Sequence, residues 1–244
     1  MGKFRRAISI IFLVPVFVPV LVIAMLSGIF YIIRLRKLGD LWLHFWIRIA
    51  IYWIWLTFGA RVHVTGKENV PKDDKNLCII ANHQSMIDIP LIFYSGFWCG
   101  IIGKVELRKV PVLNALMYEF NCVFINRKSL KESLKAINQG SENIKKGIPM
   151  AIFPEGTRSH DYSIGEFKAG AFKMATKARA TIIPVAIQNS RRLLEDPRGF
   201  GITDVYFKIL PPIETRNMDE DEVRLIHEKV EKEIRSAYET LRRV

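Results

Sequence analysis

Residues 77–90 read LCIIANHQSMIDIP. The first five residues of this stretch form an apolar run that predicts a buried strand. Polar side chains follow at positions 82, 83, 85 and 88. A surface turn does not need an imidazole for solvation, and a buried segment disfavours an ionisable pair. The sequence therefore raises the question of whether His83 and Asp88 act together at the end of this strand.

The first sixty residues are far more apolar than the rest of the chain. Residues 7–33 are 27 consecutive residues without a charge. A bilayer core about 30 Å thick needs roughly 20 helical residues, so we expect this segment to lie in a membrane. A cleaved signal peptide is the alternative, but the apolar part of such a peptide is only about 7–15 residues long.

A second apolar segment, residues 41–60, differs from the first because it contains His44, Arg48 and four tryptophans. Tryptophan prefers the membrane–water interface. We therefore expect a helix that lies in or near that interface.

The flanking charges suggest how residues 7–33 sit in the membrane. Three basic residues precede the segment and three follow it, and positive residues favour the cytoplasmic side. Pro15 and Pro19 interrupt helical hydrogen bonding near its middle. We expect a hydrophobic two-helix anchor (residues 1–60) within one leaflet of the cell membrane, with the remaining domain (residues 61–244) on the cytoplasmic side. A single crossing of the bilayer is the alternative.

The net charge of +12 arises from 36 Lys and Arg against 24 Asp and Glu, and half of this excess lies within residues 1–60. Basic residues beside apolar segments favour anionic lipid head groups. Because the excess borders apolar segments and does not form one polar face, it fits a membrane surface better than nucleic acid.

Cysteine and histidine spacing gives no metal-binding pattern. Cys78, Cys99 and Cys122 lack the CxxC spacing, and the five histidines form no HExxH motif. We expect free thiols in a reducing compartment and no metal.

From residue 61 onward, strand-like runs alternate with helical patterns. We expect strands at residues 61–65, 77–81, 100–102, 123–125, 150–153, 182–187 and 205–209, and helices at 129–146 and 172–178. Apolar residues at helical spacing between 223 and 241 predict a further packing helix. This alternation predicts an α/β fold, with a mixed, largely parallel sheet flanked by helices and preceded by the N-terminal two-helix anchor.

The polar cluster at 82–88 has two interpretations. Ser85 and Asp88 fit a helix start, with Ser85 as the cap and His83 as an ordinary loop residue. Alternatively, His83 is a general base whose other ring nitrogen is held by the Asp88 carboxylate. Residues five apart lie about 140° apart on an ideal helix, so His83 must precede the helix and Asp88 must lie in it. The two interpretations are compatible.

A second polar cluster, FPEGTRS at residues 153–159, follows the strand expected at 150–153. A Pro-Glu-Gly turn at the carboxyl end of a strand lies at the edge where open α/β sheets bind ligands. Arg158 offers a planar fork suited to phosphate. An ordinary polar turn is the alternative.

Taken together, the two clusters resemble the HxxxxD and EGTR blocks of the glycerolipid acyltransferase family, which includes the 1-acylglycerol-3-phosphate acyltransferases. Four further stretches resemble this family in order and spacing: GKVELRKVP (103–111), CVFINR (122–127), FKAGA (167–171) and IIPVAI (182–187). The resemblance covers about residues 60–215. Asn126 stands where many members carry Asp.

The resemblance implies an enzyme that transfers a fatty acyl group from a thioester of acyl carrier protein or coenzyme A to the sn-2 hydroxyl of 1-acylglycerol-3-phosphate, forming phosphatidic acid at the bilayer. His83 is the implied general base and Asp88 its orienting carboxylate, without a cofactor. The implied ligands of the substrate phosphate are Lys104, Arg127 and Arg158, and the residues that shape the pocket are Glu155, Gly156 and Thr157.

Two rival functions remain at this point. The same blocks could serve acylation of glycerol-3-phosphate or of another lysolipid, and a non-enzymatic basic membrane-surface protein is the more distant alternative. The sequence contains no GxSxG motif, which argues against a hydrolase of that type. Cys99 and Cys122 have no paired base that would suit them to carry an acyl group.

Overall fold

The computed structural model describes residues 15, 19–20, 22–23, 26–30, 32–196 and 201–241. Most of the first apolar segment, residues 7–33, lies outside these described residues. Residues 26–30 are helical, and a turn at residues 33–34 leads towards the long helix α2 (Arg36–Phe58). Among the described residues, α2 is the one helix that is long and apolar enough to cross a membrane, with a mean hydropathy of 1.3.

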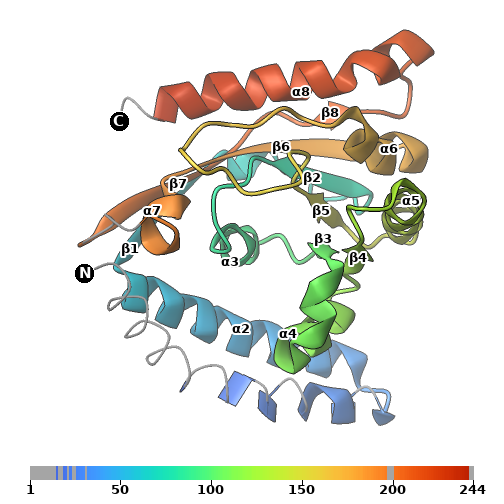
Figure 1. Ribbon diagram of the computed structural model, residues 1–244. Helices are drawn as coiled ribbons and strands as arrows, with labels where there is room; N and C mark the ends of the chain where they lie inside the picture. Colours follow the sequence, from blue (N-terminus) through green and yellow to red (C-terminus); the bar gives the residue numbers. More distant parts are fainter. Residues whose placement is uncertain are drawn as a thin grey trace.

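Beyond α2 the described chain alternates between strands and helices (Figure 1). The strands are β1 (Ala60–Thr65), β2 (Leu77–Ala81), β3 (Gly100–Lys104), β4 (Val123–Ile125), β5 (Met150–Ile152), β6 (Thr181–Gln188), β7 (Thr203–Ile209) and β8 (Ile213–Glu214). The α-helices are α3 (Asp88–Tyr94), α4 (Pro111–Glu119), α5 (Leu130–Lys145), α6 (Ala169–Ala178), α7 (Ser190–Leu194) and α8 (Glu220–Leu241), with 3-10 helices η1 (Lys67–Asn69) and η2 (Val105–Lys109).

The strands form one mixed sheet in the order β1-β7-β6-β2-β5-β3-β4, and β8 pairs with β6. The pairs of β6 with β7 and of β6 with β8 are antiparallel, and the other neighbours run parallel. The predicted mixed, largely parallel sheet is therefore confirmed. The seven predicted strands match the observed bounds within two residues. Strand β8, only two residues long, was not predicted because it is too short for a periodic pattern.

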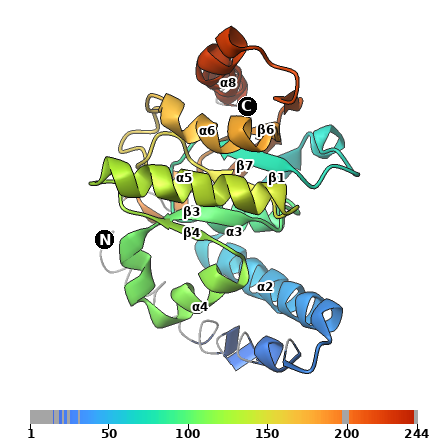
Figure 2. The same cartoon turned by 90° about the vertical axis from the view of Figure 1, so that its right-hand side faces the viewer.

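Helices cover both faces of the sheet, as Figure 2 shows. Because side chains alternate between the faces of a strand, β2 contributes to two cores. Cys78 and Ile80 pack on the side of α5, α6 and α8, whereas Ile79 and Ala81 pack on the side of α2 and α3. Strand β6 is buried along its whole length, which explains its continuous apolar sequence.

Helix α2 has two apolar faces with different surroundings. Leu43, Ile47, Ile51 and Trp55, spaced by four residues, are buried in the core shared with α3 and the sheet. The other face exposes a second set of large apolar side chains: Leu38, Leu41, Phe45, Ile49, Tyr52 and Leu56. The helix predicted at 41–60 is thus present, although it begins at Arg36 and ends at Phe58.

Two of the polar residues of α2, His44 and Arg48, pack against Trp98, which follows α3. The His44 ring stacks on the Trp98 ring with the centroids 3.8 Å apart, and Arg48 Cζ lies 5.7 Å from the same ring. Burial lowers the pKa of His44 and so favours its neutral form. These contacts explain how an apolar helix accommodates an imidazole and a guanidinium.

Asn82 directly follows β2, and its side chain continues the hydrogen bonding with β6 while the main chain leaves the sheet. Its Nδ2 donates to the Ile187 carbonyl at 2.9 Å, and its Oδ1 accepts from the Ile187 N–H at 2.8 Å. The side chain thereby imitates a strand neighbour of β6 while the main chain turns away. The side chain of Asn82 thus fixes the point from which His83 leaves the sheet.

We expect Asn82→Asp to destabilise the protein, because a carboxylate accepts from the Ile187 N–H but cannot donate to the Ile187 carbonyl. Leaving one buried group unpaired costs about 1–3 kcal/mol. Each kcal/mol lowers the melting temperature of a chain of this size by about 2–4 °C, which thermal unfolding in detergent would measure. The exposed Asn138→Asp in α5 is the matched control; an equal loss in both variants would contradict the role of Asn82.

Candidate active site

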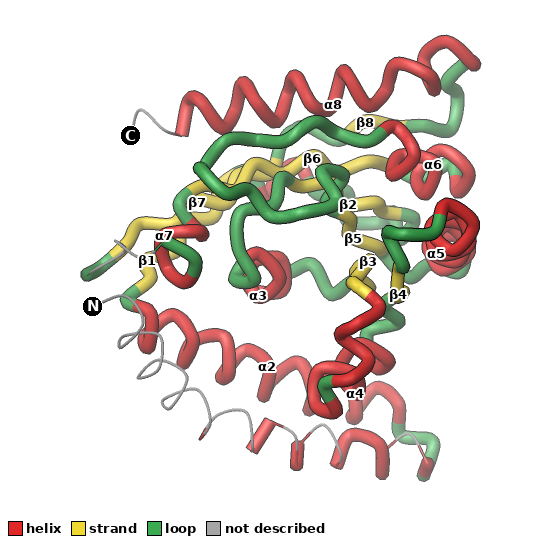
Figure 3. Tube along the Cα trace, viewed as in Figure 1, coloured by secondary structure: helices red, strands yellow, loops and turns green. Residues whose placement is uncertain are grey.

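The two polar clusters meet because their strands are neighbours. Strands β2 and β5 pair in parallel, so their carboxyl ends lie at the same edge of the sheet. The loop after β5 passes beside the loop after β2 (Figure 3). Its Ser159 N–H donates to the His83 carbonyl at 2.9 Å. Residues 82–88, here called the HxxxxD loop, and residues 153–159, here called the EGTR turn, therefore form one site.

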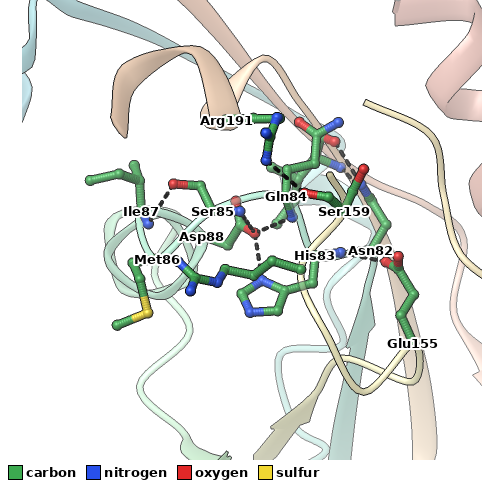
Figure 4. Close-up of polar contacts among 12 residues, drawn as sticks. Asn82, His83, Gln84, Ser85, Met86, Ile87, Asp88, Glu155, Ser159 and Arg191 are labelled. Carbon is green, nitrogen blue, oxygen red and sulfur yellow. Dashed lines mark hydrogen bonds and ion pairs between the residues drawn. The ribbon is translucent and has the colours of Figure 1, made fainter. Parts of the chain in front are cut away.

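His83 and Asp88 form a buried pair, drawn in Figure 4. His83 Nδ1 lies 2.7 Å from Asp88 Oδ2; His83 is 9% exposed, and Asp88 is fully buried. A carboxylate only accepts hydrogen bonds, so Nδ1 carries the proton of the neutral imidazole. Nε2 is then the nitrogen with a lone pair, which is the form that a general base requires.

The carboxylate of Asp88 also holds the main chain of the loop. Its Oδ2 accepts the N–H groups of Gln84 at 2.7 Å and Ser85 at 2.9 Å. The predicted cap is only half right, because α3 begins at Asp88 and its cap residue is Ile87. Ser85 Oγ accepts from the Ile87 N–H instead, at 3.1 Å, while Asp88 reaches back to Ser85 as in a capping box.

Phe153 supports the imidazole from one side. Its ring is stacked on His83 with centroids 4.0 Å apart and an interplanar angle of 14°. Phe153 begins the EGTR turn, and its carbonyl accepts the Gly156 N–H at 3.1 Å. The packed ring and the Asp88 hydrogen bond together fix the plane of the imidazole.

Glu155 connects the EGTR turn to two other backbone segments. Its Oε1 accepts the His83 N–H at 2.6 Å, and its Oε2 accepts the Gly165 N–H at 2.8 Å. Burial raises the pKa of this carboxyl, while the two N–H donors act in the opposite direction. Glu155, for which the family resemblance implies a role in shaping the pocket, holds the backbone N–H of His83.

A second His–Asp pair shows that the contact distance alone does not define a site. His63 Nε2 and Asp204 Oδ1 also lie 2.7 Å apart, on β1 and β7. Their side chains are 47% and 43% exposed. The His83–Asp88 pair differs in its burial and in the backbone donors on its carboxylate.

Arg127 and Lys168 lie on one side of the EGTR turn. Arg127 Nη1 donates to the Gly156 carbonyl. Arg127, Gly156 and Lys168 line a cleft of about 450 Å³, whose remaining lining is mostly apolar. We call this space the cationic cleft. Gly156 has a φ of +76°, and a Cβ there would lie 3.0 Å from Lys168 Nζ. The positive φ favours glycine at this position, and a Cβ here would also displace the flexible end of the Lys168 side chain.

Arg158 lies on the other side of the turn. Its Nη1 lies 2.7 Å from Glu195 Oε1. Arg158, Arg191 and His160 line a pocket of about 360 Å³. The third predicted phosphate ligand, Lys104, pairs with Glu106 at 3.2 Å. The structure therefore brings Arg127 and Arg158 to the same turn but not into the same cavity.

An apolar cavity of about 170 Å³ begins at the HxxxxD loop. Met86 and Ile89 form part of its lining, and α2, α3, α4 and β3 supply most of the rest. Further lining residues are Ile47, Ile51, Ile54, Phe93, Leu116 and Phe120. The cavity thus lies between the sheet and the helix whose outer face is exposed and apolar.

Two features of the site were not predicted from the sequence: the contact of Gln84 with α8, and the position of Lys168. The buried Gln84 donates from Nε2 to Tyr238 Oη of α8 at 2.7 Å, and Tyr238 Oη donates to the Tyr162 carbonyl at 2.6 Å. Helix α8, predicted only to pack, therefore also holds the HxxxxD loop. Lys168 lies in the FKAGA stretch, which resembles the family but predicted no site residue.

The three cysteines are free, as expected, and two of them are buried. Burial raises the pKa of Cys78 to about 12 and that of Cys122 to about 11, and it also raises the pKa of Cys99. Such thiols are poor nucleophiles at neutral pH. Among the described residues, no group of three or more His, Cys, Asp or Glu side chains could hold a metal ion.

We expect Glu155→Gln to lower both stability and activity. An amide retains one acceptor oxygen, but its NH₂ group would face either the His83 or the Gly165 N–H. The unpaired donor should cost about 1–3 kcal/mol, which thermal unfolding would detect. The exposed Glu142→Gln in α5 is the control. A Glu155→Gln variant with the parent's melting temperature and rate would contradict this role.

Comparisons with known proteins agree with this geometry. Residues 61–188 match the family model described as Acyltransferase. A 1-acyl-sn-glycerol-3-phosphate acyltransferase from Saccharomyces cerevisiae is 36% identical over 72% of this chain, which spans 59% of the yeast protein. A probable 1-acyl-sn-glycerol-3-phosphate acyltransferase from Mycoplasma pneumoniae is 30% identical over 91% of this chain and 88% of its own length.

The fold agrees as well. The crystal structure of the 1-acyl-sn-glycerophosphate (LPA) acyltransferase PlsC from Thermotoga maritima superposes with a TM-score of 0.79 and 29% identity, over 99% of this chain and 98% of the other. The matched family region contains both the HxxxxD loop and the EGTR turn. This chain therefore belongs to the acyltransferase family.

Proposed function

We propose that this chain transfers a fatty acyl group from an acyl thioester to the sn-2 hydroxyl of 1-acylglycerol-3-phosphate, forming phosphatidic acid. One observation carries the proposal: the buried His83–Asp88 pair belongs to a loop that contacts the EGTR turn with its neighbouring cations and that supplies Met86 to the lining of an apolar cavity. An acyl chain, a reacting hydroxyl and a phosphate require these three environments. The names of the relatives in yeast, Mycoplasma and Thermotoga support the choice of acceptor.

His83 performs the proton transfer in this mechanism. Nε2 takes the proton of the acceptor hydroxyl as its oxygen attacks the thioester carbonyl carbon. Asp88 keeps the other ring nitrogen protonated and stabilises the imidazolium that forms. When the tetrahedral intermediate collapses, the C–S bond breaks and the imidazolium proton passes to the leaving sulfur. The transfer is direct and forms no acyl-enzyme.

The acceptor phosphate is assigned to Lys104, Arg127 and Arg158, although Arg127 and Arg158 line different cavities on the two sides of the EGTR turn. Arg127 and Arg158 flank the same turn, which also touches His83 through its Ser159 N–H. The register of β3 with β4 places Lys104 beside Ile125, two residues before Arg127. Lys168 joins this set because it lines the cationic cleft with Arg127. Charge-assisted hydrogen bonds from such groups fix the position of a phosphate as well as its affinity.

The apolar cavity suits an acyl chain. Burying one CH₂ group from water gains about 0.8 kcal/mol, so a closed apolar slot can discriminate chain length. Met86 belongs both to the HxxxxD loop and to the cavity lining, so the loop that carries His83 also borders the slot. The acyl donor is a thioester of acyl carrier protein or coenzyme A.

The anchor is proposed to hold the site at the bilayer surface. The exposed apolar face of α2 fits the acyl region of one leaflet, and the helical residues before it turn back against it, with the Phe30 and Trp42 rings 6.3 Å apart. This hairpin supports a two-helix anchor (residues 1–60) that does not fully span, with residues 61–244 as a cytoplasmic catalytic domain. The acceptor then reaches the site laterally, without leaving the membrane.

We expect His83→Ala to lower the rate of acyl transfer at least 10²- to 10⁴-fold, because the general base is lost. Thioester consumption would be measured with purified protein in phospholipid vesicles, using lysophosphatidate and glycerol-3-phosphate as acceptors. The matched control is His63→Ala, which removes the imidazole of the exposed His–Asp pair. Near-parental turnover by His83→Ala would refute the role of His83 as general base. If the parent protein acylated glycerol-3-phosphate faster than lysophosphatidate, glycerol-3-phosphate would be the preferred acceptor.

We expect Arg158→Ala to raise the KM for the acceptor more than it lowers kcat, because a phosphate ligand is removed from the ground and transition states alike. A charge-assisted hydrogen bond contributes about 1.5–3 kcal/mol, or roughly 10- to 150-fold in KM. Arg224→Ala, which removes an exposed arginine paired with an acid on α8, is the control. Unchanged acceptor kinetics in Arg158→Ala would refute the role.

A further inference from the structure

Glu195 lies outside every motif of the sequence, yet it joins two of them. It directly follows α7, and its Oε1 accepts the Met86 N–H at 3.0 Å. The same oxygen lies 2.7 Å from Arg158 Nη1. Met86 belongs to the HxxxxD loop and Arg158 follows Gly156 in the EGTR turn, so one carboxylate oxygen bridges both halves of the site.

The bridge starts from a segment that is itself fixed. Arg191 Nη1 donates to the Ser159 carbonyl of the EGTR turn at 2.7 Å. Asn189, which precedes α7, donates to the Asp204 carbonyl of β7 at 3.0 Å. The side chain of Glu195 is 15% exposed, whereas that of Arg158 is 43% exposed. Glu195 is therefore the anchored partner, and Arg158 is the partner that it holds.

This contact leaves Arg158 able to bind an anion. A guanidinium carries five N–H donors in a planar fork, and Glu195 engages Nη1. The contact with Glu195 uses Nη1, so the N–H groups on Nη2 and Nε are left for a second anion. An arginine held in one orientation loses less side-chain entropy when a ligand binds.

We propose that Glu195 is a positioning residue that aims the Arg158 guanidinium at the acceptor phosphate and keeps it in register with His83. The inference rests on the proposed function because it takes Arg158 as a phosphate ligand. Glu195 acts through Arg158 and does not itself touch the substrate.

The test compares variants of the full chain in phospholipid vesicles, with acceptor and donor kinetics measured separately. Glu195→Ala should raise the acceptor KM about three- to tenfold, the equivalent of one side chain that must be ordered on binding. The donor KM should not change, and kcat should change less than the acceptor KM. Glu195→Gln keeps an acceptor oxygen at this position and should restore most of the parental KM.

Two comparisons isolate the path through Arg158. In an Arg158→Ala background, Glu195→Ala should cause no further rise in the acceptor KM, because the residue on which it acts is gone. Asp196→Ala is the matched control: this neighbouring carboxylate accepts from Tyr162 Oη at 2.6 Å. If Glu195→Ala does not fold, Glu195→Met supplies the same comparison with the side-chain volume retained.

Several results would overturn the inference. A fall in the acceptor KM of Glu195→Ala would mean that the carboxylate repels or competes with the phosphate. A loss confined to kcat that persists in the Arg158→Ala background would mean that Glu195 acts through the Met86 N–H. If Arg158→Ala raises the acceptor KM but Glu195→Ala does not, this inference fails alone. If Arg158→Ala leaves the acceptor KM unchanged, the proposed role of Arg158 as a phosphate ligand is refuted, and the role of Glu195 with it.

Discussion

The hydrogen bonds of the Asp88 carboxylate are the constraint on which the site depends. One oxygen of this fully buried group accepts from the His83 ring and from the N–H groups of Gln84 and Ser85. A buried charge is tolerated only when such donors surround it. The same oxygen thus sets the path of the loop and the tautomer of the imidazole, so the structural and the chemical interpretations of this motif describe one arrangement.

Several elements of the fold hold the HxxxxD loop in position through hydrogen bonds. Asn82 fixes its start on β6, and Glu155 holds the His83 N–H from the neighbouring turn. Gln84 reaches Tyr238 of the last helix. Each contact comes from a different element, so the position of the imidazole depends on the whole α/β domain and not on its own loop alone. Such support from several elements is what a preorganised site requires.

Helix α2 lines the apolar cavity on one side and is exposed on the other. Ile47, Ile51 and Ile54 line the apolar cavity, while Leu41 and Phe45 are exposed on the opposite side. If α2 lies in one leaflet, as proposed, a single helix separates the lipid chains of the bilayer from the slot for the acyl chain. This arrangement would suit an enzyme whose acceptor and product are both membrane lipids, because the chains never need to enter water.

Features that depend on neighbours along the chain could be predicted from the sequence. Strand and helix periodicities gave the mixed, largely parallel sheet, and the five-residue spacing placed His83 before a helix and Asp88 in it. Tertiary structure alone decided which distant groups complete the site. Glu195 is 109 residues from Met86, and Tyr238 is 154 residues from Gln84. The tertiary structure also placed the side chains of Arg127 and Arg158 on opposite sides of the EGTR turn. The physical reason is that periodicity records which face of an element is buried, whereas a hydrogen bond between remote residues depends on strand order and helix docking, which leave no local pattern.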